Sequence, residues 1–212
     1  TESGNARRTT LDYLAVGLPL GKFGVGFGLI PYSSVGYKIS SVSEDPTQNN
    51  RRFNGSGGLN KAFFGVGFKI APNFSIGADV NYNFGKIETN NFEYITDISI
   101  GTRELNKVDL SGVNFNLGMM YQTKINKKIS FFSSVNYSLE STLKTENTRN
   151  IATAIYNSNF DLSIVDVLDD VKTERNLKIP SKFNAQAGFG EARKWLVGVG
   201  YTFQGAGSLD NS

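Results

Sequence analysis

The sequence contains no cysteine and no histidine. Without cysteine there is no disulfide framework and no thiol nucleophile, and without histidine the commonest general base and nearly all zinc or haem ligation are excluded. No carboxylates are paired on a common strand face, so no acid–base couple is visible. We therefore expect a protein that is not an enzyme and that binds no cofactor and no metal.

Charged residues and long apolar runs are also scarce. Charged residues make up 19% of the 212 residues, below the roughly 25% of soluble domains. The net charge of +3 is too small to indicate a nucleic-acid partner. No run approaches the roughly 18 apolar residues that a membrane-spanning helix needs, so a helical membrane protein is excluded. We expect any export signal to have been removed or to lie outside this sequence.

Glycine and aromatic residues are abundant, and they alternate with each other. There are 23 Gly, 16 Phe and 9 Tyr. In the stretch PNFSIGADVNYNFGK (72–86), every second residue from Phe74 to Phe84 is apolar or aromatic, and the residues between are small or polar. A period of two predicts β-strands. The pattern predicts about eight of them, near residues 11–18, 23–29, 64–70, 74–84, 113–121, 129–139, 183–189 and 195–203.

The predicted connections also alternate, between short and long. Four tight turns are expected at 20–22, 71–73, 126–128 and 191–193. Long polar joins are expected at roughly 40–54, 88–106 and 142–178. Short turns at one rim and long loops at the other are typical of outer-membrane β-barrels. The sequence therefore predicts an all-β fold, a transmembrane antiparallel up-and-down β-barrel, integral to the bacterial outer membrane.

Aromatic residues gather beside the tight turns, as in the interfacial girdle of such barrels. The predicted membrane-interface aromatics are Phe23, Phe68, Phe74, Tyr121, Phe131 and Trp195. The apolar face would contact outer-membrane lipids, and lipid would force the sheet to close. The alternative is a soluble β-sandwich. Its solvent-exposed face would carry Lys, Glu and Arg, whereas the polar face here consists of Gly, Asn and Ser.

With the tight turns in the periplasm, both ends of residues 1–212 would lie outside the cell. Barrels of even strand number normally start and finish in the periplasm. We therefore expect a single barrel domain that is incomplete at both ends and belongs to a barrel of about 12 to 14 strands.

Three stretches of sequence resemble the FadL-like family of outer-membrane transporters. They are LPLGKFGVGFGLIPYSSVGY (18–37), KIAPNFSIGADVNYNFG (69–85) and IPSKFNAQAGFGEARKWLVGVGYTF (179–203), with Pro180 and Trp195 in matching places. The resemblance implies a fourteen-stranded barrel with an N-terminal plug. It also implies passive transport of hydrophobic small molecules, with a hydrophobic ligand in the lumen.

A second role is open for such a barrel. Some FadL-like barrels transport nothing and are subunits of larger outer-membrane assembly or secretion complexes. Long loops rich in Asn and Thr would then dock other outer-membrane proteins or lipoproteins. Co-purifying protein partners would favour this role, and a lipid-like ligand in a monomer would favour transport.

Several other features have a functional and a simpler reading. The glycine strings GVGFG and GVGYTF do not fit the spacing of phosphate-binding loops, so strand bending or close approach of another segment explains them better. Pro31 removes a donor from the strand ladder, which predicts a kink or bulge and, less simply, a lateral opening.

The predicted long joins contain the remaining candidates. The acidic residues Asp161, Asp166, Asp169 and Asp170 could bind calcium through oxygen ligands, but a solvated loop is the simpler reading. The basic residues Arg51, Arg52, Arg103 and Lys144 could meet lipopolysaccharide phosphates in external loops, and again solvation is the default.

Overall fold

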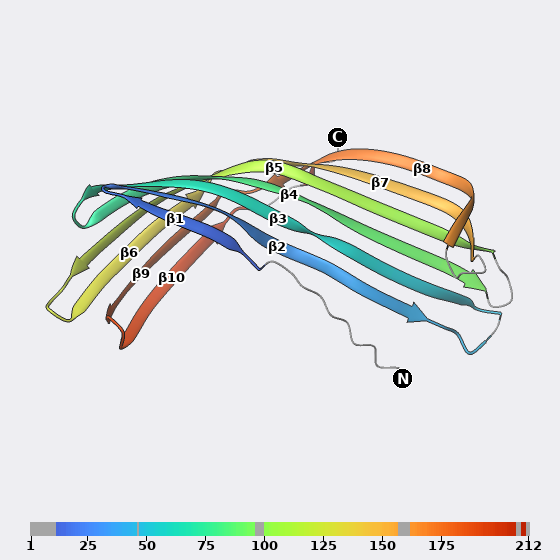
Figure 1. The fold of residues 1–212 in the computed structure, drawn as a ribbon, viewed down its shortest axis with the longest axis horizontal. Coiled ribbons are helices and arrows are strands. Elements are labelled where there is room, and N and C mark those ends of the chain that lie inside the picture. The colour runs from blue at the N-terminus through green and yellow to red at the C-terminus, as the bar shows by residue number, and fades with distance from the viewer. Residues whose placement is uncertain (1–11, 46, 96–99, 157–161, 207–208, 211–212) are drawn as a thin grey trace.

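The protein is an all-β structure built on one antiparallel sheet (Figure 1). The computed structural model describes residues 12–45, 47–95, 100–156, 162–206 and 209–210. The strands are β1 (Leu14–Leu20), β2 (Phe23–Ser41), β3 (Asn49–Ala71), β4 (Phe74–Ile95), β5 (Ile100–Lys124), β6 (Ile129–Ser138), β7 (Ser141–Tyr156), β8 (Leu162–Ile179), β9 (Lys182–Glu191), β10 (Trp195–Gln204) and β11 (Leu209–Asp210). No helix among these residues is long and apolar enough to cross a membrane.

The eleven strands follow eight continuous paths across the sheet. Strand β6 pairs with the C-terminal half of β5, and β7 pairs with its N-terminal half. Strands β9 and β8 lie alongside β6 and β7 in the same way, and β10 and β11 follow β9 and β8. The sheet is thus an up-and-down meander of eight long strands. This confirms the predicted all-β class and the number of strands.

The predicted connections are confirmed at one end of the sheet, and the prediction is wrong at the other end. The tight turns 20–22, 71–73, 126–128 and 191–193 each lie between two strands and gather at the same end (Figure 1). The predicted long joins are mostly strand, because β2 to β5, β7 and β8 run through them. Alternation of apolar and polar residues fades there, but the backbone ladder continues without it. Strands β3 and β5 reach 23 and 25 residues, about twice the 9–11 that cross a bilayer.

The sheet is open in the part of the chain that the structure describes. Its order runs from β1 at one edge to β10 at the other, and no pairing joins these two strands. The expected closure into a barrel is therefore not seen among these residues. All residues of β1 and β10 are exposed, since each strand has a neighbour on one side only.

The sheet is bent across the middle of its long strands (Figure 1). A line of glycines, prolines and strand breaks crosses every path but the first near this bend. On β3, Gly57 has a φ of 120°, and a Cβ there would collide with the carbonyl oxygen of Lys86. On the other paths this line passes the register shift after Pro31 on β2, Gly85 on β4 and Gly112 on β5. It then passes the strand breaks at 139–140, 180–181 and 205–206. We call this the bend line. It divides the sheet into a turn half, which holds the tight turns, and a far half.

Candidate functional site

The turn half carries one continuous apolar face. The register places Val16, Phe27, Phe64, Val80 and Phe115 opposite one another on five successive strands. Because side chains alternate between faces with a period of two, most of the apolar residues of every strand in this half share that face. Most of them are exposed, for example Phe115 at 53%. The turn half therefore presents a broad apolar surface with no protein covering it among the described residues.

The face continues over the remaining strands. Leu117 on β5 lies opposite Tyr137 on β6, and Phe183 on β9 lies opposite both Tyr137 and Phe203 on β10. An apolar patch larger than a few hundred Å² usually marks a contact with a membrane or another protein. A patch that spans eight strands is far beyond the size expected of a surface exposed to water.

The six predicted interface aromatics all lie on this face, beside the tight turns. Phe23 and Phe68 pair across β2 and β3 with ring centroids 4.7 Å apart. Phe74 lies opposite Tyr121, whose ring is 6.4 Å from that of Phe131. Trp195 meets Phe189 edge to face at 5.9 Å. The sequence analysis missed Phe189 as a member of this group, although it alternates with Gly188 and Gly190 in the same pattern.

A second aromatic group lies at the bend line and was not predicted. Tyr82 and Phe84 stack at 5.5 Å on β4, ten residues beyond Phe74. Ten steps of about 3.4 Å on a strand tilted by about 45° rise about 24 Å, which matches the roughly 25 Å apolar band of outer-membrane barrels. The two aromatic groups therefore bound the apolar surface at its two ends, and we call the surface between them the apolar belt.

The opposite face of the turn half is mostly small and polar, although Ile30 and Phe63 also lie on it. Gly24, Gly67, Gly77 and Gly118 lie opposite one another on four successive strands and form its floor. A cavity of about 490 Å³ lies over this floor and is also lined by Lys61, Asp79, Asn81, Asn116 and Asn136.

Hydrogen bonds tie the polar residues of this face together. The carboxylate of Asp79 accepts from the side-chain amide of Asn116 at 2.7 Å and from that of Asn81, which is only 2% exposed. Asn83 donates to Asn114 at 2.7 Å on the same pair of strands. This network holds amides and one carboxylate but no acid–base couple, so it is suited to water and to hydrogen-bonded ligands.

Pro31 lies where the register of β2 against β3 shifts by one residue, between Pro31 and Ser33. A second cavity, of about 820 Å³, adjoins this bulge and is lined by Pro31, Tyr32, Gly57, Gly58 and Gly85 among others. Beyond the bulge, β1 no longer pairs with β2, so β2 is an edge strand there.

The far half is dominated by charged pairs between neighbouring strands. Three of them continue the face of the apolar belt: Lys86 to Asp109 at 3.5 Å, Glu88 to Lys107 at 3.4 Å and Lys172 to Glu146 at 3.8 Å. We call this surface the charged face. It replaces the apolar belt immediately beyond Phe84, which is where a sheet leaving the hydrocarbon would meet water.

Two carboxylates on the other side of the far half have lowered pKa values. Arg149 donates to Glu104 at 2.7 Å, and this hydrogen bond holds the pKa of Glu104 below its usual 4.5. For Glu93, the hydrogen bond from Asn49 at 2.8 Å lowers the pKa most, followed by that from Arg51 at 3.1 Å. Both groups therefore stabilise the sheet in their ionised form.

The residues that we expected in external loops lie on strands instead. Arg51 and Arg52 are on β3, Arg103 is on β5 and Lys144 is on β7. Arg51 pairs with Glu93, Arg103 donates to Asn90 at 3.1 Å, and Arg52 lies over the Tyr94 ring at 5.5 Å. These arginines are engaged within the sheet.

The acidic residues of the predicted calcium candidate are likewise on a strand. Asp166, Asp169 and Asp170 lie on β8, and Asp161 lies outside the described residues. Among the described residues no group of three or more acidic side chains is arranged to hold a metal ion. An extended strand separates consecutive carboxylates too widely to gather them around one cation.

Comparison with known proteins gives one family. The sequence model of the BamG family matches residues 1–212. No curated protein and no solved structure matches significantly. The resemblance to FadL-like transporters is therefore wrong. The resemblance depended on short sequence patterns in which aromatic residues, glycine and a turn proline follow one another. Any outer-membrane sheet with this alternation contains such patterns.

Proposed function

Because the chain belongs to the BamG family, we propose that it is an integral outer-membrane subunit with a role in outer-membrane protein assembly. The family name associates the chain with the Bam complex, the outer-membrane assembly complex. This corresponds to the second role considered from the sequence, a barrel-like subunit that transports nothing. The transport role depended on the FadL resemblance and is not retained.

The observation that carries this proposal is the apolar belt across all eight strand paths. Burying such a belt in hydrocarbon removes apolar side chains from water at about 25 cal/mol per Å². Backbone groups of the sheet interior are already paired, as lipid requires. The edge strands β1 and β10 need partners in the membrane, either from each other or from further strands.

Partner proteins are proposed to dock on the charged face of the far half. This surface continues the proposed lipid-facing side, so neighbours in the same membrane can reach it without entering the polar side of the sheet. It presents alternating Lys and carboxylate side chains, and complementary charges on a partner would fix the orientation of the complex. The role is structural, with no catalysis.

Membrane insertion is tested on outer membranes that contain the full protein. After an alkaline carbonate wash, an integral protein stays with the pellet and is released only by detergent. Release by carbonate alone would show peripheral attachment and would refute the proposal.

Partner docking is tested by affinity purification in mild detergent. The double change Glu88→Lys with Lys107→Glu keeps the ion pair and the net charge but inverts the pattern on the charged face. We expect it to lower recovery of partner proteins at least fivefold. The matched control is Glu104→Arg with Arg149→Glu, which inverts an ion pair on the opposite side and should leave recovery unchanged. Equal recovery with both variants would contradict docking on this face.

A further inference from the structure

The end of the sheet with the tight turns is strongly basic. Seven basic residues lie in or beside the four turns: Lys22, Lys69, Lys124, Lys127, Lys128, Arg193 and Lys194. All seven are exposed, and the one acidic residue among them is Glu191. We call this set the basic rim. The other 15 basic and 18 acidic residues give the rest of the chain a charge of −3, so the positive charge is concentrated at this end.

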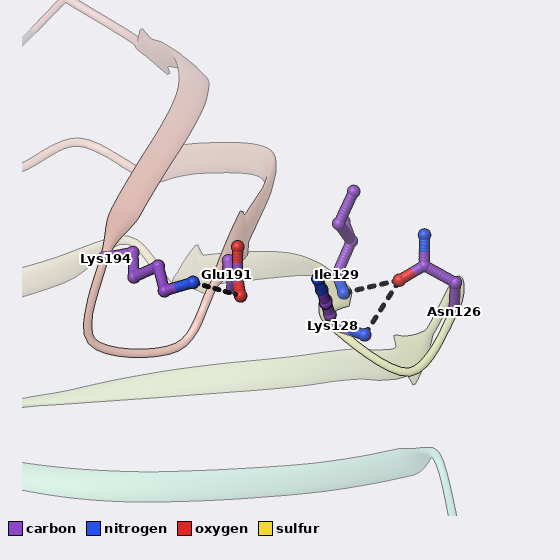
Figure 2. Close-up of polar contacts among 5 residues, drawn as sticks. All are labelled: Asn126, Lys128, Ile129, Glu191 and Lys194. Carbon is purple, nitrogen blue, oxygen red and sulfur yellow. Dashed lines mark hydrogen bonds and ion pairs between the residues drawn. The ribbon is translucent and has the colours of Figure 1, made fainter.

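The turns fix the positions of these charges (Figure 2). In the third turn, the side-chain oxygen of Asn126 accepts from the backbone N–H groups of Lys128 and Ile129, both at 2.8 Å. In the fourth turn, Lys194 pairs with Glu191 at 2.9 Å. No ion pair neutralises the other six basic residues in the part of the chain that the structure describes.

The basic rim adjoins the aromatic residues at the edge of the apolar belt. Lys22 precedes Phe23, and Lys69 follows Phe68 on the neighbouring strand. The backbone N–H of Lys69 donates to the carbonyl of Lys22 at 2.8 Å, which places the two residues side by side. In a membrane, aromatic rings at this level sit among the headgroups, and lysine chains extend past them to the polar layer.

We propose that the basic rim binds the anionic phospholipid headgroups of the leaflet in which the tight turns lie. The proposal rests on the proposed function, because it requires the apolar belt to be inserted in a bilayer. Basic residues occur at all four turns, next to the aromatic level, and not in one patch on one side. That distribution fits a surrounding layer of headgroups better than a single acidic protein.

The test uses the detergent-purified protein and measures how many lipids it retains by native mass spectrometry. Dioleoyl phosphatidylglycerol and dioleoyl phosphatidylcholine are the anionic and zwitterionic probes. The wild type is expected to retain more of the anionic lipid. In the variant Lys127→Gln with Lys128→Gln, that preference should fall at least fivefold, the effect of about one charge near an anionic surface.

The control variant is Lys38→Gln with Lys144→Gln, which removes the same charge from exposed positions on the far half. Its lipid preference should stay within twofold of the wild type. Equal retention of both lipids by the wild type would overturn the proposal, as would an equal fall in both variants. Loss of an acidic protein partner from the rim variant, with its lipid preference intact, would overturn it in favour of protein binding. Failure of insertion is a separate result, seen as release by carbonate.

Discussion

Phe23 and Phe68 lie directly opposite each other on β2 and β3, with ring centroids 4.7 Å apart, next to the exposed side chains of Lys22 and Lys69. On each strand the cationic residue is the sequence neighbour of the aromatic one. A second aromatic pair, Tyr82 and Phe84, closes the belt at the bend line. The belt therefore has two defined edges, one beside the tight turns and one at the bend line.

A charge in the middle of the apolar belt should destabilise the inserted sheet. Leu117 lies midway along the belt on β5 and is 50% exposed. We expect Leu117→Arg to lower the free energy of unfolding by about 2–4 kcal/mol in phospholipid vesicles. The measurement is urea unfolding followed by the fluorescence of Trp195, the one tryptophan of the chain. Met120→Arg, on the other face of the same strand, should cost about 1 kcal/mol or less. Equal costs would show that the belt does not face lipid.

Gly57 should tolerate no side chain. Its φ of 120° is rarely adopted by other residues, and a Cβ would collide with the Lys86 carbonyl oxygen. We expect Gly57→Ala to cost about 1–3 kcal/mol of unfolding free energy. Gly17 is the matched control, since no atom lies within 4 Å of the position of its Cβ. Gly17→Ala should change stability by about 0.5 kcal/mol or less, and a similar loss in both variants would remove the special role of Gly57.

The Glu104–Arg149 pair should stabilise the far half in a pH-dependent way. The hydrogen bond from Arg149 lowers the pKa of Glu104 below 4.5, so its contribution is present above that pH and is lost as the pH falls through the lower, folded-state pKa. We expect Glu104→Gln to be less stable than the wild type at pH 7, and the difference to shrink in acid. Because both side chains are partly exposed, a double-mutant cycle with Arg149→Gln should give a coupling of about 1 kcal/mol or less. A difference that grows in acid would contradict this assignment.

Asp79 should be required for the hydrogen-bond network on the polar face of the turn half. It accepts hydrogen bonds from Asn81 and Asn116, and Asn81 is buried. We expect Asp79→Ala to cost about 1–3 kcal/mol because the buried amide loses its acceptor. Asp79→Asn keeps an acceptor oxygen and should recover most of that loss. If both variants are as stable as the wild type, the network is replaced by water.

The sequence predicted the turn half well and the far half poorly. Between Phe74 and Phe84 one face is apolar and the other is small and polar, so the alternation is strong and identifies the strand. Beyond the bend line both faces carry mixed polar residues, as at Lys86, Glu88 and Thr89. The sequence there no longer alternates between apolar and polar residues. Those segments remain strands because each pairs with a neighbour over its whole length. Such pairing depends on residues distant in sequence, which a local pattern does not record.

The candidate surfaces likewise fall into those that the sequence could predict and those that it could not. The aromatic residues beside the turns could be identified from their spacing, whereas Tyr82 and Phe84 could not, because the second edge of the belt lies in the middle of long strands. The ion pair of Glu88 and Lys107 was invisible for a similar reason. It joins the two ends of one segment, roughly 88–106, that was expected to be a loop.

The bend line has a mechanical consequence. It crosses seven of the eight paths with residues that either lack a side chain, lack a backbone donor or interrupt a strand, so its few backbone angles set the inclination of the far half to the turn half. In the proposed membrane-inserted state, a partner bound to the charged face would change the angle between the two halves by bending the sheet at the bend line.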